Sequence, residues 1–111
     1  DLPGGGVDGD ETEEQAVVRE FAEETGLAVV PGKFVTRAIQ YWSRKRTRPR
    51  HANSAFYRVR LTGPAEGPRE PDHDLVWMRP DRAIACLRHE AHAWALSVAL
   101  REEVSADVEP L

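Results

Sequence analysis

Three glutamates crowd one short segment of the chain, REFAEETG, which runs from Arg19 to Gly26. If the segment is helical, each residue turns by about 100°, so Glu20, Glu23 and Glu24 fall within one arc of about 100°. Glu20 and Glu24 then stand one turn apart as a like-charge pair, which is mildly destabilising. A hard divalent cation such as Mg²⁺ turns this repulsion into binding, because it prefers oxygen ligands. The alternative is an acidic helix face exposed to solvent.

The residues around the glutamates predict the helix that would position them. Thr12 and Gln15 fit a capping box at its start, and Gly26 fits the stop at its end. Apolar residues fill most of the side opposite the carboxylates: Val17, Val18, Phe21 and Ala22. We therefore expect a helix within residues 12–26 that packs this apolar side on a sheet and holds the carboxylates beside it.

Charge is sorted along the chain, although the net charge is only −4. Residues 1–27 contain nine acidic residues and one basic residue, and residues 33–60 contain nine basic residues and no acidic one. Such asymmetry indicates an anionic ligand, a cation, or both. The alternative is two solvated faces that balance each other.

Three other motifs fail on spacing or context. Residues 4–9 contain the glycines of GxGxxG, but the helix after them would present carboxylates to a pyrophosphate. The segment DGDETEEQAVVR opens like a calcium loop, but Glu13 stands at its sixth position and Arg19 at its twelfth. The segment HEAH, from His89 to His92, lacks the HExxH spacing of zinc proteases, so we expect a surface position near a helix start.

The whole stretch from Gly5 to Leu27 matches one longer pattern. Gly5 is followed after five residues by Glu11 and after seven more by Arg19, and the pattern continues as E-U-x-E-E-x-G-U, where U is apolar. This is the Nudix box, G-x5-E-x7-R-E-U-x-E-E-x-G-U, matched at every defined position over 23 of the 111 residues. The chain therefore resembles a Nudix hydrolase of the MutT-like kind.

The resemblance implies a loop–helix–loop that carries Mg²⁺ or Mn²⁺ and assigns roles to its residues. The implied metal ligands are Glu20, Glu23 and Glu24, and Glu11 would bind a further metal or support the loop. Catalytic roles fall to Glu20 or Glu24, as acceptor of a proton from water, and to Arg19, which would brace a carboxylate. Gly5 and Gly26 would shape the two loops. Some family members use a carboxylate on a distant loop instead, and the candidates for that are Glu66, Glu70, Asp72 and Asp74.

The basic stretch offers groups that could recognise a substrate. Arginine binds phosphate oxygens by paired hydrogen bonds, and an aromatic ring can stack on a base. The candidates of these two kinds are Arg37, Arg44, Arg46, Arg58 and Trp42. Arg37 and Arg58 lie on expected strands and are better placed to be rigid, whereas residues 43–51 read as a basic loop. The alternatives are a solvated loop and, for Trp42, packing in the core.

The remaining sequence predicts an α/β fold. The expected elements are strands around a Pro31–Gly32 turn within residues 27–42, a strand over 52–62, a short buried strand over 75–78, a short helix over 80–85 and a long helix over 89–104. We assign Trp77, Trp94 and Cys86 to the core.

The resemblance implies a single Nudix domain over residues 1–111, with the box at residues 5–27. Its sheet would be mixed and would lie between helices, as an α/β/α sandwich. Family members usually have one or more strands before the box. We therefore expect the sheet to lack its N-terminal strand or strands here, or to receive them from another chain, which would make a homodimer. An unpaired sheet edge of this kind favours pairing.

The implied activity is Mg²⁺-dependent hydrolysis of the pyrophosphate bond in a small-molecule nucleoside diphosphate linked to another group X. The alternative is a non-catalytic Nudix fold that binds a nucleotide and regulates a partner, although a pure binder has no need of all three glutamates. A net charge of −4 argues against non-specific binding of nucleic acid over the surface of the protein. The chain contains no run of about 18 apolar residues, so its sequence predicts no membrane span. Its single cysteine favours the reducing cytoplasm as its location.

Overall fold

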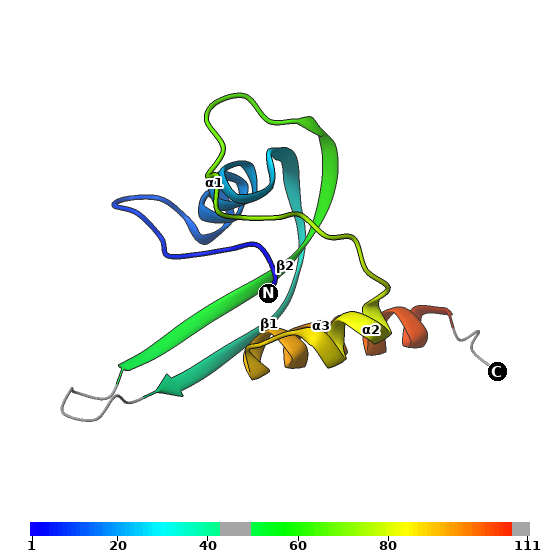
Figure 1. Cartoon of the computed structure of the whole chain (residues 1–111). Coiled ribbons are helices and arrows are strands. Elements are labelled where there is room, and N and C mark those ends of the chain that lie inside the picture. Colours follow the sequence, from blue (N-terminus) through cyan, green and yellow to red (C-terminus); the bar gives the residue numbers. More distant parts are fainter. Residues whose placement is uncertain (43–49, 108–111) are drawn as a thin grey trace. The chain divides into compact units, whose positions relative to one another are not determined.

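The structure, a computed structural model, describes residues 1–42 and 50–107. Its elements follow in the order helix α1 (Glu13–Thr25), strands β1 (Leu27–Trp42) and β2 (Arg50–Pro64), and helices α2 (Pro80–Cys86) and α3 (Glu90–Asp107) (Figure 1). β1 and β2 pair with each other in a two-stranded sheet. The turn expected at Pro31–Gly32 is wrong, because β1 continues through both residues. The mixture of helices and strands confirms the α/β class expected from the sequence.

The chain divides into two compact units, and each contains part of the β1–β2 hairpin. The first, here called the α1 unit, consists of Leu2–Lys33 and Tyr57–Trp77. The second, here called the α3 unit, consists of Asp1, Phe34–Phe56 and Met78–Leu111. The whole segment that resembles the Nudix box lies in the α1 unit.

Both ends of α1 are fixed by residues that the sequence marks for this purpose. At the start, the Thr12 hydroxyl accepts from the backbone N–H of Gln15 at 3.1 Å, and the Gln15 side chain accepts from the backbone N–H of Thr12 at 2.9 Å. At the end, Gly26 has φ +73°, in the left-handed region, and donates its N–H to Ala22 O at 2.9 Å. An N-cap of this kind contributes about 1 kcal/mol. The predicted helix and its two ends are confirmed.

The packing face of α1 is smaller than expected. Ala16 and Thr25 are buried, whereas Val18 is exposed and Phe21 is only partly covered. The Thr25 hydroxyl is satisfied locally, because it donates to Phe21 O at 2.6 Å and accepts from Leu27 N at 3.2 Å. The expected apolar side of the helix is therefore covered only in part.

Within the α1 unit, the hairpin and the loop after it are tied to the end of the helix. The Thr62 hydroxyl donates to Ala28 O at 3.2 Å across the two strands. The chain then passes over α1 (Figure 1), where Ala65 N donates to Gly26 O at 2.9 Å and Glu70 N donates to Glu23 O at 2.7 Å. These backbone bonds hold residues 65–70 of the loop beside the C-terminal end of α1.

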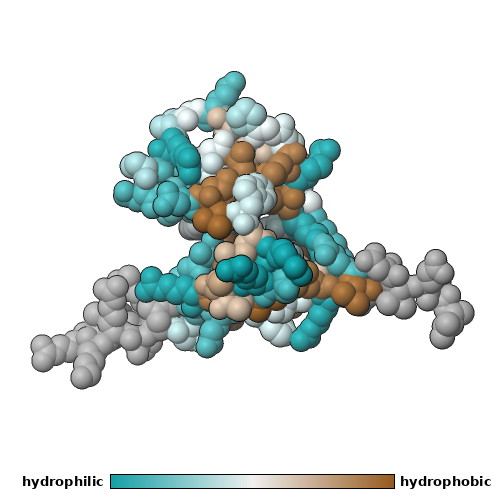
Figure 2. All heavy atoms as spheres, turned by 45° about the vertical axis from the view of Figure 1, so that its right-hand side comes forward, coloured by the Kyte–Doolittle hydropathy of each residue, from teal (hydrophilic) through white to brown (hydrophobic). Residues whose placement is uncertain are grey.

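The sheet is incomplete, as the sequence led us to expect. The described residues contain two paired strands rather than the larger mixed sheet that the family resemblance implied. The short buried strand predicted over residues 75–78 is wrong: this segment forms neither strand nor helix, and Val76 and Trp77 are 67% and 70% exposed. An apolar run is buried only where another element covers it. Figure 2 shows hydrophobic side chains at the surface in several places.

The α3 unit contains the two C-terminal helices. α2 begins at Pro80, where the missing N–H of proline is harmless, and α3 follows with Ala95 buried. The core assignments of Trp94 and Cys86 are wrong, because both residues are exposed. The guanidinium of Arg101 lies over the Trp94 ring at 5.8 Å and covers it in part. None of the described helices combines the length and the apolar character that crossing a membrane requires.

Candidate active site

Arg19, in the middle of α1, gathers carboxylates from the helix and from the loop before it. Its Nε and Nη2 donate to the two carboxylate oxygens of Glu11 at 2.9 and 3.0 Å. Its Nη1 donates to Glu20 at 2.9 Å and to Glu23 at 3.2 Å. Nη2 also donates to the carbonyl oxygen of Gly6 at 2.7 Å. A single guanidinium therefore fastens the glycine-rich loop to the helix and fixes two of the three glutamates.

The contacts between Arg19 and Glu11 shift the pKa values of both residues. Hydrogen bonds from Arg19, together with one from the backbone N–H of Asp8, hold the pKa of Glu11 below its ordinary value. Hydrogen bonds to Glu11 and Glu20 raise the pKa of Arg19. The paired, two-pronged contact with Glu11 is the geometry in which arginine binds a carboxylate most strongly. Glu11 thus acts in the described contacts as the anchor of the loop.

Glu24 is held in a different way, because its partner is another carboxyl group. Burial and a hydrogen bond with Glu20 raise the pKa of Glu24 to about 7, against an opposing hydrogen bond from the backbone N–H of Gly4 and the nearby charge of His73. Two carboxylates in contact cannot both ionise easily, so the pair retains a proton near neutral pH. A cation placed at this pair would replace the proton.

Gly5 leaves the space that the Glu20 carboxylate occupies. A Cβ added at Gly5 would touch both carboxylate oxygens of Glu20 and would lie 2.6 Å from its Cδ. The obstacle is the end of a flexible side chain, so the carboxylate would turn away at little cost to the fold. A glycine is required here by close approach rather than by backbone strain.

We expect the Gly5→Ala variant to lose activity with little change in stability. The added methyl group would displace the Glu20 carboxylate from Arg19 and Glu24. If Glu20 binds the metal as the family resemblance implies, such a displacement typically costs about 10–100-fold in activity or metal affinity. Gly6→Ala is the matched control, because a Cβ at Gly6 would meet nothing within 4 Å. Steady-state turnover and thermal melting of the two variants check this expectation. Equal turnover in both would show that the position of Glu20 does not matter.

Comparison with known families agrees with this geometry. The model of the NUDIX domain family matches residues 1–101, which is most of the chain and includes all of α1 and the loop before it. The chain belongs to the Nudix family. A search among curated proteins found no significant match. Nudix proteins are a family of hydrolases that generally use divalent metal ions and act on small-molecule nucleotide derivatives.

The three glutamates of α1, here called the Nudix helix, are divided between two interactions. Glu20 and Glu23 both bind Arg19, and Glu24 is hydrogen-bonded to Glu20. Among the described residues, these three carboxylates do not bring one oxygen each within 4.8 Å of all the others. Glu20 is the member common to both interactions, and its side chain is 14% exposed against 37% for Glu23. A cation bound by all three would draw Glu23 toward the Glu20–Glu24 pair.

The loop after β2 brings further groups to the Nudix helix. Among the described contacts of the four loop carboxylates named above, the backbone of Glu70 is the one bonded to α1. The Glu70 carboxylate also pairs with His73 Nε2 at 2.8 Å, and the charge of His73 in turn acts on Glu24. Neither His73 nor the Gly4 N–H could be identified from the sequence, because neither occupies a defined position of the box. The acidic, proline-rich composition of the loop was the available signal.

The candidate substrate residues are spread over both units. Arg58 belongs to the α1 unit, whereas Arg37 belongs to the α3 unit, where its Nη1 donates to Asn53 Oδ1 at 3.2 Å across the hairpin. Trp42 ends β1, and its side chain is outside the described part of the structure. Arg44 and Arg46 lie outside the described residues altogether. Substrate recognition by these residues remains a prediction.

Proposed function

We propose that the protein catalyses the Mg²⁺-dependent hydrolysis of the pyrophosphate bond in a nucleoside diphosphate linked to another group X. The observation that carries this proposal is the enforced contact between Glu20 and Glu24, backed by Gly5 and Arg19 within a matched Nudix domain. Without a cation, both carboxyl groups of this pair cannot ionise easily, so they share a proton. A divalent cation bound between the two carboxylates would offset their repulsion, and this explains why the protein holds them in contact.

The donor set suits the metal that the family membership implies. The side chains around the contact offer carboxylate oxygens, with no cysteine or histidine among the residues of the box. Hard cations such as Mg²⁺ and Mn²⁺ prefer such oxygen ligands. We assign Glu20, Glu23 and Glu24 as ligands, with Glu11 as support for the loop. Bound there, the ion would neutralise the diphosphate and lower the pKa of an attacking water.

The protein side chains have distinct tasks in this proposal. Arg19 keeps Glu20 and Glu23 in place through Nη1 and fastens the loop through Glu11. The pKa of Glu24, raised to about 7, makes its ionised carboxylate a stronger base than an ordinary glutamate. Once a cation has displaced the proton of the pair, this carboxylate would be suited to accept a proton from water. Glu70, on the loop bonded to α1, is the alternative acceptor. Arg58 is our candidate in the same unit for binding substrate phosphate.

A product screen tests the proposal. Purified protein is incubated with a panel of nucleoside diphosphate derivatives and Mg²⁺, and the products are identified by mass. We expect cleavage between the two phosphorus atoms of at least one compound, abolished by a chelator, with heavy oxygen from labelled water in one product. Tight binding of a nucleotide without turnover would instead indicate a non-catalytic binding module. A cytoplasmic location fits this substrate class and is part of the proposal.

A further inference from the structure

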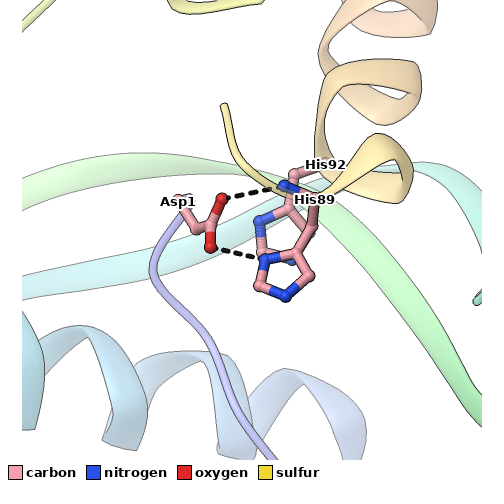
Figure 3. A group of neighbouring side chains, drawn as sticks. All are labelled: Asp1, His89 and His92. Atoms are coloured by element: carbon pink, nitrogen blue, oxygen red, sulfur yellow. Dashed lines mark hydrogen bonds and ion pairs between the residues drawn. The ribbon is translucent and has the colours of Figure 1, made fainter. Parts of the chain in front are cut away.

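Asp1, His89 and His92 form a second group of metal-ligating side chains, which has no part in the Nudix chemistry. One potential ligand atom from each residue lies within 4.8 Å of the other two. Asp1 Oδ2 is 2.5 Å from His89 Nδ1, and the two imidazole rings are 5.3 Å apart between centroids. All three residues belong to the α3 unit (Figure 3). Among the described residues, Asp1, His89 and His92 are the group of potential metal ligands whose ligand atoms all lie within 4.8 Å of one another.

The start of α3 holds the two histidines on one side of the helix. His89 directly precedes the helix, and His92 lies in its first turn, three residues later. Residues three apart are neighbours on a helix surface. The turn is closed, because His92 N and Ala93 N donate to His89 O at 3.0 and 3.2 Å. The spacing of the two imidazoles is therefore set by backbone structure and not by flexible side chains alone.

Asp1 is oriented by hydrogen bonds on one oxygen, which leaves the other for the histidines. Its Oδ1 accepts from the backbone N–H groups of Arg88 and His89 at 2.9 and 3.2 Å. Its Oδ2 faces the His89 ring (Figure 3). Ligands of bound metals are commonly held in place by such outer hydrogen bonds. If Asp1 served only to accept hydrogen bonds from the backbone before α3, its Oδ1 atom would be sufficient. That role does not explain why His92 also offers a ligand atom within 4.8 Å of Asp1 and His89.

His92 is fixed from the other side by an aromatic contact. The Phe56 ring meets it edge-on, with centroids 5.5 Å apart and an interplanar angle of 79°. Burial, and to a lesser degree the charge of His89, lower the pKa of His92. The lowered pKa favours the neutral imidazole, which is the form that binds a metal.

We propose that Asp1, His89 and His92 bind a transition-metal dication of the zinc type. Two imidazoles and one carboxylate are ligands for Zn²⁺, Co²⁺ or Ni²⁺, whereas Mg²⁺ and Ca²⁺ select oxygen. Ligand distances near 2.0–2.1 Å imply about 3.3 Å between ligand atoms in a tetrahedron. Binding would therefore draw His92 inward, move Asp1 Oδ2 and His89 Nδ1 apart from 2.5 Å, and displace the proton between them. A fourth position would remain for water or another ligand.

Zinc titration in excess Mg²⁺ tests the proposal, because Mg²⁺ competes for carboxylate oxygens such as those of α1 but not for a site with two imidazoles. We expect the unaltered protein to bind one Zn²⁺ and, with Co²⁺, to show the visible absorption of tetrahedral nitrogen and oxygen coordination. His92→Gln should weaken Zn²⁺ binding at least about 100-fold. His73→Gln is the matched control, because His73 pairs with Glu70 in the α1 unit, and it should leave the Zn²⁺ affinity unchanged.

A second variant separates the ligand role of Asp1 from its role at the helix start. Asn caps a helix as well as Asp, so Asp1→Asn keeps the acceptor for the two backbone N–H groups and removes the anionic ligand. We expect unchanged melting without metal and at least about 10-fold weaker Zn²⁺ binding. Absence of Zn²⁺ binding by the unaltered protein, or equal affinity in the unaltered protein, His92→Gln and Asp1→Asn, would overturn the proposal.

Discussion

Glu24→Gln should lower turnover with Mg²⁺ by at least about 100-fold, as expected for the loss of a metal ligand or proton acceptor. The substitution preserves the shape of the side chain and removes its charge. It also preserves the hydrogen bond to Glu20, because an amide can donate where the protonated carboxyl group donates now. Any loss of activity therefore reports on the charge of Glu24 and not on packing. Steady-state turnover of the purified variant measures the effect.

The same substitution should stabilise the metal-free protein at high pH. The folded chain keeps a proton on Glu24 up to pH about 7, against an ordinary value of 4.5. Folding therefore binds a proton between these two pH values, and stability falls as pH rises through the window. Glutamine resembles the protonated form and removes this fall. We expect a gain of about 1 kcal/mol at pH 8, less than the shift alone would give because the carboxyl group is partly in water.

The two effects of Glu24→Gln have opposite signs, and a purely structural residue would not produce that combination. Melting in a chelator across pH 5–8 and turnover with Mg²⁺ should be measured on the same preparation. Glu14→Gln is the control, since Glu14 is exposed in the first turn of the same helix. Retained turnover would remove Glu24 from the mechanism. A loss of both turnover and metal-free stability would make it a structural residue.

Arg19→Ala should reduce both turnover and stability, in contrast to Glu24→Gln. The variant leaves Glu11, Glu20 and Glu23 without their shared counter-charge and releases the loop at Gly6. Loss of a residue that orients metal ligands typically costs about 10–100-fold in activity or metal affinity. Arg19→Lys should recover only part of the loss, because an ammonium group keeps the charge but cannot bind two carboxylates in paired geometry.

A surface arginine provides the control for Arg19. Arg79 pairs with Asp81 at 3.3 Å, with both side chains largely in solvent, and such pairs contribute little. Arg79→Ala should therefore melt and turn over like the unaltered protein. If Arg19→Ala behaved in the same way, the ion pairs around Arg19 would be incidental to the site. Thermal melting with and without Mg²⁺, together with turnover, distinguishes these results.

The parts of the fold that could be predicted are those whose signals are local. The limits of α1 follow from Thr12, Gln15 and Gly26, each of which acts within a few residues of its own position. The family follows from the spacing within residues 5–27. The contact of Gly5 with Glu20 gives a physical reason for one of the defined glycines.

The parts that could not be predicted depend on what covers a residue or on pairs distant in sequence. The apolar run at Trp77 reads as a buried strand, yet it is exposed, because burial requires a covering element that the run itself does not specify. Trp94 and Cys86 fail for the same reason. Asp1 and His89 are separated by 88 positions, so no spacing rule connects them. His89 and His92 attracted no metal prediction because HEAH lacks the spacing of a known zinc motif.

The capping of α1 has a consequence for the order of folding. Both ends of the helix are encoded within residues 12–26, so its formation requires no contact with distant parts of the chain. Helices form in about a microsecond, whereas a β-hairpin takes about 1–10 microseconds. A lone helix of 13 residues is only marginally populated, but it already places Glu20, Glu23 and Glu24 in their final register. The carboxylates that we propose as metal ligands are therefore aligned on one face of the helix before the hairpin closes.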